Sequence, residues 1–210
     1  MPNQPTVFVV DDDLSVRRSL SRLLQSVGYR VKDFASAKEF LQNEADRNWG
    51  CLVLDVQLPQ FTGLELQQAL PQAPLSIVFI TGHGSVPISV QAMKHGAVDF
   101  LEKPLKAGEL LRAVESALTR SREEYQEQLA DAAVRARLSL LTPREYQVLC
   151  GVVAGKLNKQ IAADLGVGEK TIKVHRGRVM KKMGARSVAS LVQAVSGNLR
   201  VSTAPAVVST

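Results

Sequence analysis

The chain has 210 residues, of which 45% are apolar and 22% are charged, a composition typical of folded globular proteins. This length allows two small domains, and no apolar run approaches the roughly 20 residues of a membrane-spanning helix, which excludes an integral helical membrane protein. The apolar stretch 7–10 lacks the basic start and the cleavage site of a secretory signal, so we expect a cytoplasmic protein.

The net charge of +6 is distributed unevenly along the chain. Residues 1–120 hold 12 Lys and Arg against 13 Asp and Glu, and residues 121–138 hold 3 against 4, whereas residues 139–210 hold 11 against 3. This concentration of positive charge favours nucleic acid as a partner of the C-terminal part. Cys51 and Cys150 lie in different halves, and we interpret both as buried packing residues of a protein from a reducing compartment.

Short β-rich runs alternate with amphipathic segments over the first 120 residues, which is the pattern of βα units around a parallel sheet. The predicted strands are residues 7–10, 29–34, 51–54, 77–80 and 100–101, and the predicted helices are 14–26, 37–44, 64–70, 87–94 and 107–117. Gly28 and Gly96 follow two of these helices where a left-handed residue is favoured, and Pro87 suits a first helical position. We therefore predict an α/β fold with a five-stranded, doubly wound parallel sheet.

Polar residues stand at the same end of the predicted strands. Asp11 and Asp12 follow the first strand, Asp55 follows the third, Thr81 follows the fourth, and Lys103 lies beyond the fifth. The carboxyl ends of parallel strands share one edge of the sheet, where ligands bind, so these side chains should converge. Clustered carboxylates repel one another unless a cation offsets them, and an all-oxygen site suits Mg²⁺. Asp55 could then attack a phosphoryl group while the metal and Lys103 neutralise charge, which predicts phosphoryl transfer.

Four segments of this half resemble the receiver domains of two-component response regulators over residues 5–120: VFVVDDD, LVLDVQLP with Gly63 after it, FITGHG and DFLEKP. The resemblance implies a flavodoxin-like sheet with strand order 2-1-3-4-5 and phosphorylation of Asp55. It also implies that Asp12 and Asp55 bind Mg²⁺ together with the main-chain carbonyl of Gln57, and that Asp11 acts through a water molecule.

The same resemblance implies roles for residues at the last two strands of the sheet. Thr81 and Lys103 would hold the phosphoryl oxygens, and Phe100 would be the aromatic switch residue that rotates inward together with Thr81. The bond between Lys103 and Pro104 would be a cis peptide.

Residues 139–210 have the pattern of four short helices. Thr142, Pro143 and Glu145 carry the signature of a capping box with an N1 proline, at the start of a helix that stops at Gly155. Three further helices follow: one capped by Asn158, one over residues 169–183 and one that begins near residue 187. This predicts a compact all-α helix-turn-helix domain.

The predicted helix 169–183 has an apolar stripe and a basic face on opposite sides. The stripe, which includes His175 as a packing residue, is Ile172, His175, Val179 and Met183. A solvated face is the ordinary interpretation of such basic residues on an isolated helix, but this helix follows a Gly-bounded turn in the most basic part of the chain. We therefore interpret the basic face as a DNA-binding surface for the major groove; it comprises Lys170, Lys173, Val174, Gly177, Arg178 and Lys181, with Arg176 and Lys182 at its margins.

Three runs in this half, LTPREYQVL, NKQIAADLGV and EKTIKVHRGRVMKKM, are similar to LuxR-type DNA-binding domains over residues 139–196. The whole chain thus resembles the FixJ/NarL subfamily of response regulators. The sequence departs from the pattern of this family at two positions. Gly168 stands where a Ser or Thr cap is common, and Gly177 lies in the middle of the DNA-binding surface. The resemblance implies a histidine kinase and double-stranded promoter DNA as partners, with a homodimer that forms on phosphorylation and RNA polymerase as a further candidate partner.

We expect residues 1–120 to form the receiver domain, residues 121–138 a helical linker and residues 139–210 the DNA-binding domain. The linker contains no Gly or Pro, which favours a helix. The last fifteen residues are expected to be disordered. Two alternatives remain open: a metal-dependent phosphohydrolase would explain only the acidic site, and a constitutive DNA-binding protein would explain only the basic half. A phosphorylation-controlled transcription factor, not an enzyme, explains both halves and is the predicted function.

Overall fold

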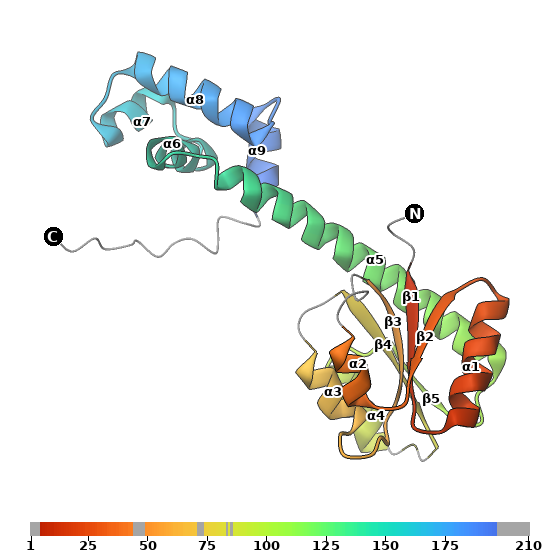
Figure 1. Cartoon of the computed structure of the whole chain (residues 1–210). Helices are drawn as coiled ribbons and strands as arrows, with labels where there is room; N and C mark the ends of the chain where they lie inside the picture. Colours follow the sequence, from red (N-terminus) through yellow and green to blue (C-terminus); the bar gives the residue numbers. More distant parts are fainter. Residues whose placement is uncertain (1–4, 44–48, 71–73, 83, 85, 197–210) are drawn as a thin grey trace. The chain divides into compact units, whose positions relative to one another are not determined.

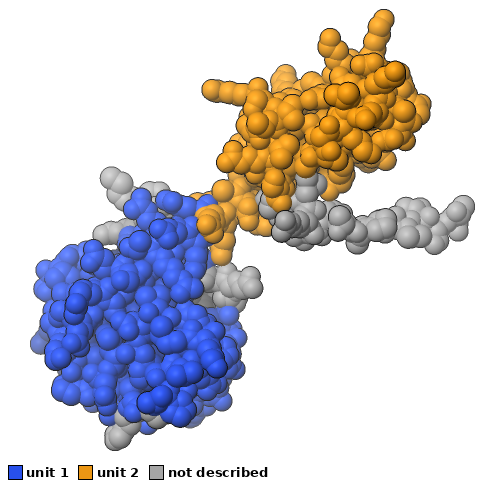
Figure 2. Space-filling model, turned by 180° about the vertical axis from the view of Figure 1, so that it is seen from behind, with its two compact units in different colours: residues 1–126 blue, residues 127–210 orange. Residues whose placement is uncertain are grey.

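The computed structural model describes residues 5–43, 49–70, 74–82, 84 and 86–196, and the chain forms two compact units (Figures 1 and 2). Unit 1 comprises residues 1–126 and unit 2 comprises residues 127–210. Each unit has its own apolar core. Among the described residues, no helix combines the length and the hydropathy needed to cross a membrane.

Unit 1 is built on a five-stranded parallel sheet with the strand order β2-β1-β3-β4-β5, as predicted. The strands are β1 (Thr6–Val10), β2 (Arg30–Phe34), β3 (Gly50–Asp55), β4 (Leu75–Thr81) and β5 (Asp99–Glu102). Every residue of β1, β3 and β4 is buried. Such continuous apolar runs are typical of parallel strands that helices cover on both faces.

Helices cover both faces of this sheet (Figure 1). One face packs against α2 (Ala37–Gln42), α3 (Gly63–Ala69) and α4 (Val86–Lys94), and the other packs against α1 (Leu14–Ser26) and the first part of α5 (Ala107–Leu138). The alternation of side chains along β1 divides its residues between the two cores, with Phe8 on the first face and Val7 on the second.

The ends of the helices in unit 1 agree with most of the predicted signals. Gly28 and Gly96 follow α1 and α4 with φ of 92° and 90°, in the left-handed region. α4 begins at Val86, so Pro87 is its second residue and not its first. α2 ends at Gln42, two residues before the predicted end at residue 44. Residue 44 lies outside the described residues, as does the C-terminal segment from residue 197 on, for which the sequence predicts disorder.

The segment 121–138 is helical and continues α5. Its first residues pack on unit 1 at the amino end of the sheet. The buried Ser121 hydroxyl accepts a hydrogen bond from Gly50 N at 2.7 Å and donates one to the carbonyl of Pro74. Tyr125 stacks on Trp49 with ring centroids 6.5 Å apart and an interplanar angle of 16°. These contacts place the residues up to Tyr125 in the packing of unit 1.

Unit 2 contains the four predicted short helices: α6 (Pro143–Val153), α7 (Asn158–Leu165), α8 (Glu169–Met183) and α9 (Val188–Val195). The capping box at α6 forms as predicted, since Thr142 Oγ1 accepts from Glu145 N and Glu145 accepts from Thr142 N. The last turn of α5 belongs to the same packing, where Arg137 Nη1 donates to the carbonyl of Met183 at 3.1 Å. The predicted helix-turn-helix domain is confirmed.

Two predictions for unit 2 are wrong in detail. The N-cap of α7 is Leu157, and Asn158 is the first helical residue. Cys150 is exposed, although Cys51 is buried as expected. α6 turns Leu149 and Val152 toward the core. Cys150, which directly follows Leu149, therefore lies on the solvent side of the helix.

Glu145 is 2% exposed and forms an ion pair with Lys182, whose Nζ lies 2.6 Å from Glu145 Oε2. The hydrogen bond from Lys182, and then that from the main-chain N–H of Thr142, lower the pKa of Glu145 to about 2. A folded-state pKa below the ordinary carboxyl value of about 4.3 stabilises the fold above that value. The contribution is lost as the pH falls toward about 2.

We therefore expect acid to loosen unit 2 between about pH 4.5 and pH 2, and Glu145→Gln to remove most of this local pH dependence. Amide hydrogen exchange in α6 and α8 at several pH values measures the effect in the full chain. Glu169→Gln, at an exposed acid in the first turn of α8, is the matched control and should keep the parent's pH profile. A Glu145→Gln protein with the parent's acid sensitivity in α6 would contradict this role of the ion pair.

Candidate functional site

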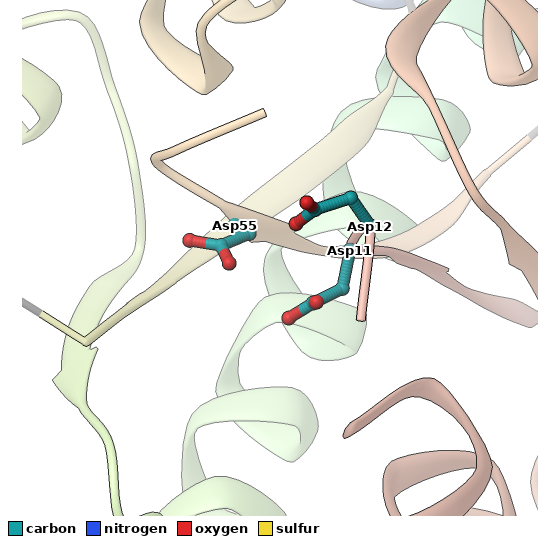
Figure 3. Close-up of side chains that lie close together, drawn as sticks. All are labelled: Asp11, Asp12 and Asp55. Carbon is teal, nitrogen blue, oxygen red and sulfur yellow. The ribbon is translucent and has the colours of Figure 1, made fainter. Parts of the chain in front are cut away.

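Three carboxylates converge at the carboxyl edge of the sheet in unit 1 (Figure 3). Asp11 and Asp12 directly follow β1, and Asp55 is the last residue of β3. One carboxylate oxygen from each lies within 4.8 Å of the others. Asp11 and Asp55 are buried, at 0% and 5% exposure, whereas Asp12 is exposed. The structure thus brings Asp55 next to the adjacent pair Asp11 and Asp12, which is far from it in the sequence.

The ammonium of Lys103 bridges the two buried carboxylates. Its Nζ lies 2.7 Å from Asp11 Oδ2 and 2.7 Å from Asp55 Oδ2. Burial raises the pKa of Asp11 above its ordinary value, and the hydrogen bond from Lys103 opposes this change. Burial lowers the pKa of Lys103, but the hydrogen bonds to Asp11 and Asp55 outweigh it and raise the pKa of the ammonium overall. Lys103 therefore stays charged and offsets the repulsion between its two partners.

The loop after β3 holds Asp55 from the other side. Gln57 N donates to Asp55 Oδ1 at 3.1 Å, and Gly63 N donates to the carbonyl of Val56 at 3.0 Å. A Cβ atom at Gly63 would lie 2.4 Å from the main-chain oxygen of Asp55. Only glycine lets α3 begin this close to the end of β3, which explains the glycine in the sequence motif.

The residues predicted from the last two strands lie at the same edge. Thr81 ends β4 and is fully buried, and Lys103 N donates to its carbonyl at 2.7 Å. Phe100 in β5 is half-buried, with its ring 6.2 Å from that of Phe79. The Lys103–Pro104 peptide bond is cis. The edge of the sheet thus holds every predicted polar residue of unit 1.

Sequence reasoning missed the contacts that shape the loop between β1 and α1. Asp13 is the N-cap of α1, and its Oδ1 accepts from Ser15 N at 2.7 Å. Arg17 is buried in α1 and donates to the main-chain carbonyls of Asp11 and Asp12. The acid of a β-strand-to-helix turn is a recognisable capping signal, but an arginine within an amphipathic helix carries no such signal.

The donor set fits a divalent cation that prefers oxygen ligands. All three side chains are carboxylates, two of them are buried, and they lie within reach of one ion. Asp12 makes no side-chain hydrogen bond or ion pair within the described residues, so its carboxylate is available as a ligand. A receiver-like acidic pocket of this kind is what the magnesium prediction requires.

In unit 2, α8 has the two faces that its spacing predicts. Ile172, Val179 and Met183 are buried in the core, and His175 is half-buried beside them. The residues on the other side are exposed to solvent, and the hydrophobic one, Val174, is 53% exposed. These exposed residues are Lys170, Lys173, Val174, Gly177, Arg178 and Lys181.

Arg176 differs from the other basic residues of α8. It is half-buried, and its Nη1 donates to Asn158 Oδ1 in α7 at 2.8 Å. This hydrogen bond ties the two helices of the helix-turn-helix to each other. The structure therefore places Arg176 between the helices and not on the open face with Lys173 and Arg178.

Comparison with known protein families matches both parts of the chain. Residues 7–115 match the response regulator receiver domain, and residues 139–195 match the bacterial regulatory proteins of the luxR family. The first match covers unit 1 from β1 into α5, and the second covers α6 to α9.

Relatives match over most of the chain. It is 49% identical to Nodulation protein W of Bradyrhizobium diazoefficiens, over 89% of this chain and 83% of that protein, and 44% identical to Transcriptional regulatory protein FixJ of Azorhizobium caulinodans, over 92% of each. Among solved structures, response regulator StyR is 45% identical with a TM-score of 0.82, covering 93% of this chain and 100% of StyR. Full-length FixJ from B. japonicum is 40% identical with a TM-score of 0.56, covering 92% and 97%.

Proposed function

Since this chain belongs to the two-component response regulators that carry a LuxR-type DNA-binding domain, we propose that phosphorylation of Asp55 controls its binding to promoter DNA. One observation carries the proposal: Lys103 bridges Asp11 and Asp55 beside the open carboxylate of Asp12. An acceptor carboxylate, a cation site and an ammonium in one pocket are the parts that phosphoryl transfer needs.

The proposed donor is a phosphohistidine of a partner histidine kinase. One oxygen of the Asp55 carboxylate attacks the phosphorus, an O–P bond forms, and the N–P bond breaks with its electron pair passing to the imidazole nitrogen. Asp12, Asp55 and the carbonyl of Gln57 would hold Mg²⁺, with Asp11 acting through water, and a bound ion would supply charge neutralisation for the transferring oxygens. Lys103 and Thr81 hold the phosphoryl oxygens of the product.

The proposed division of the chain follows from this chemistry. Residues 1–120 receive the phosphoryl group, residues 121–138 are a helical linker, and residues 139–210 bind paired DNA half-sites through the exposed face of α8. The protein transfers phosphate to itself and is not a turnover enzyme. We place it in the cytoplasm, as a homodimer when phosphorylated, with RNA polymerase as a further partner at the promoter.

We expect acetyl phosphate with Mg²⁺ to add one phosphoryl group at Asp55, because a small phosphodonor needs only the nucleophile and the metal site. Intact-protein mass spectrometry measures the added mass. Asp55→Asn or removal of Mg²⁺ should abolish the addition, since the first removes the nucleophile and the second the charge neutralisation. Full modification of the Asp55→Asn protein would contradict the assignment. Lys103→Ala should still accept phosphate but lose the increase in DNA affinity.

The second expected effect is dimerisation through α4 and α5. An apolar row on α4 is exposed in the single chain, with Val86, Val90 and Met93 at 77%, 45% and 47% exposure. Phosphorylation would replace the single negative charge of the Asp55 carboxylate by an acyl phosphate with a total charge of about −1.5 to −2, and Thr81 and Phe100 would convert this change into a dimer-forming state of this face.

Sedimentation velocity before and after phosphorylation tests this step at concentrations near the dissociation constant. Val90→Glu should keep phosphorylation but remove the dimer, because a carboxylate on a buried dimer face is costly. Val27→Glu, at a 49% exposed residue after α1, is the control and should dimerise like the parent. An unchanged monomer fraction after phosphorylation of the parent would exclude dimerisation as the route to tight DNA binding.

Gly177 gives a prediction about the DNA face. It lies inside α8, and a Cβ atom there would meet nothing within 4 Å, so the fold itself does not require glycine. Gly177→Ala should stabilise unit 2 by about 1 kcal/mol, the usual helix preference of Ala over Gly. If α8 approaches the groove closely at this point, the same change should weaken specific binding and leave the nonspecific, salt-dependent component intact.

Lys173→Ala is the contrast for Gly177→Ala, because loss of a phosphate contact lowers affinity for every sequence and reduces the salt slope by about one. Melting temperature and affinity at several salt concentrations, on operator and random duplexes, separate the two effects. A Gly177→Ala protein that is more stable and binds its operator as tightly as the parent would show that the glycine has no role in close approach.

A further inference from the structure

Arg17 is a buried cation next to the acidic cluster that the phosphorylation chemistry above does not use. It lies in the first turns of α1 and is 9% exposed. One nitrogen, Nη1, donates to the main-chain carbonyl of Asp11 at 2.7 Å and to that of Asp12 at 2.9 Å. Its Nε faces Asp33 Oδ2 in β2 at 3.4 Å.

These contacts hold the backbone of the loop that carries two of the three carboxylates. The loop is also fixed at Asp11 N, which donates to the carbonyl of Phe34 at 3.3 Å, and at Asp13 N, which donates to Asp11 Oδ1 at 2.9 Å. Asp12 differs from its neighbours because its carboxylate has no partner in the described part of the chain. Its direction is therefore set by its backbone, and the contact that holds the Asp12 carbonyl comes from Arg17.

The choice of arginine is consistent with this geometry. A guanidinium is a planar group with five N–H donors, and one of its nitrogens, Nη1, serves both adjacent carbonyls here, whereas an ammonium is a compact point charge on a flexible stem. Burying it costs free energy unless its donors are satisfied. Nη1 has two carbonyl partners, whereas the buried Nε makes no hydrogen bond within the described residues and only faces Asp33 Oδ2 at 3.4 Å. The neighbouring Arg18 is exposed and shares none of these contacts.

We propose that Arg17 is a positioning residue for the cation site: by holding the carbonyls of Asp11 and Asp12, it aims the Asp12 carboxylate at Asp55 before any ion binds. The inference rests on the proposed function, since it assigns Arg17 to the same Mg²⁺ site. Arg17 acts through Asp12 and touches neither the ion nor the phosphoryl group. Outer groups that orient metal ligands typically change metal affinity by about 10- to 100-fold when they are removed.

The test is calorimetric titration of the full chain with Mg²⁺ alone, without a phosphodonor. Arg17→Met keeps the apolar stem and removes the donors, and we expect it to weaken Mg²⁺ binding about tenfold. Arg17→Lys keeps the charge but replaces the fork by a single ammonium, so it should recover part of the affinity. Arg18→Met and Asp33→Asn are matched controls that leave both carbonyl contacts in place, and both should bind Mg²⁺ like the parent.

A double-mutant cycle separates positioning from a general loss of stability. In an Asp12→Asn background the ligand that Arg17 aims is already missing, so Arg17→Met should have little further effect on Mg²⁺ affinity. A merely structural role would lower the melting temperature and leave the coupling with Asp12 at zero. Should Arg17→Met fail to fold, Arg17→Lys in both backgrounds carries the same comparison.

Three outcomes decide the matter. Weaker Mg²⁺ binding by Arg17→Met with coupling to Asp12 supports the proposal. Parent-like Mg²⁺ affinity in a folded Arg17→Met or Arg17→Lys protein overturns the positioning role while the proposed function stands. A parent protein that does not bind Mg²⁺ at all overturns the proposed metal site and the role of Arg17 with it.

Discussion

Two buried carboxylates share one ammonium in unit 1, and the geometry of the carboxyl edge depends on that arrangement. Asp11 and Asp55 each lie 2.7 Å from Lys103 Nζ. Without the ammonium the two carboxylates would repel each other in a poorly solvated pocket. The three residues come from the loop after β1, the end of β3 and the loop after β5. Only a parallel sheet with β1 beside β3, and β5 two strands further on, brings them to one edge.

The sequence was sufficient to predict which residues meet in unit 1, but not how each one is used. The three consecutive aspartates show the difference. Asp11 pairs with Lys103, Asp12 is open to solvent, and Asp13 caps α1. Strand ends and helix starts are local signals, so the positions of these residues could be read from spacing. Arg17 could not be found in this way, because its contact with the Asp11 and Asp12 carbonyls depends on the path of the turn between β1 and α1.

In unit 2, too, the sequence predicts the position of a residue better than its contacts, and the difference appears at the edges of helix faces. Periodicity separated the buried Ile172 from the exposed Lys173 correctly, since these positions lie well inside their faces. Arg176 lies at a margin, where a long side chain can turn to solvent or to a neighbouring helix. It turns to Asn158, which the sequence suggested as a cap and which instead accepts this hydrogen bond. A residue's helical phase predicts its side of the helix, whereas its partner depends on how α7 and α8 pack.

The free energy available for switching follows from the contact that Lys103 already makes. Its ammonium lies 2.7 Å from Asp55 Oδ2, so the proposed phosphorylation would change an existing partner of Lys103 and would not create the first one. The driving force is therefore a difference between two sets of contacts of the same ammonium. Such a difference needs about 5.5 kcal/mol to move a two-state population from 1:99 to 99:1. Because Lys103 N donates a hydrogen bond to the carbonyl of Thr81, a shift of Lys103 toward the charge of the proposed phosphoryl group would act directly on the end of β4. A loosely held lysine would transmit less of that free-energy difference.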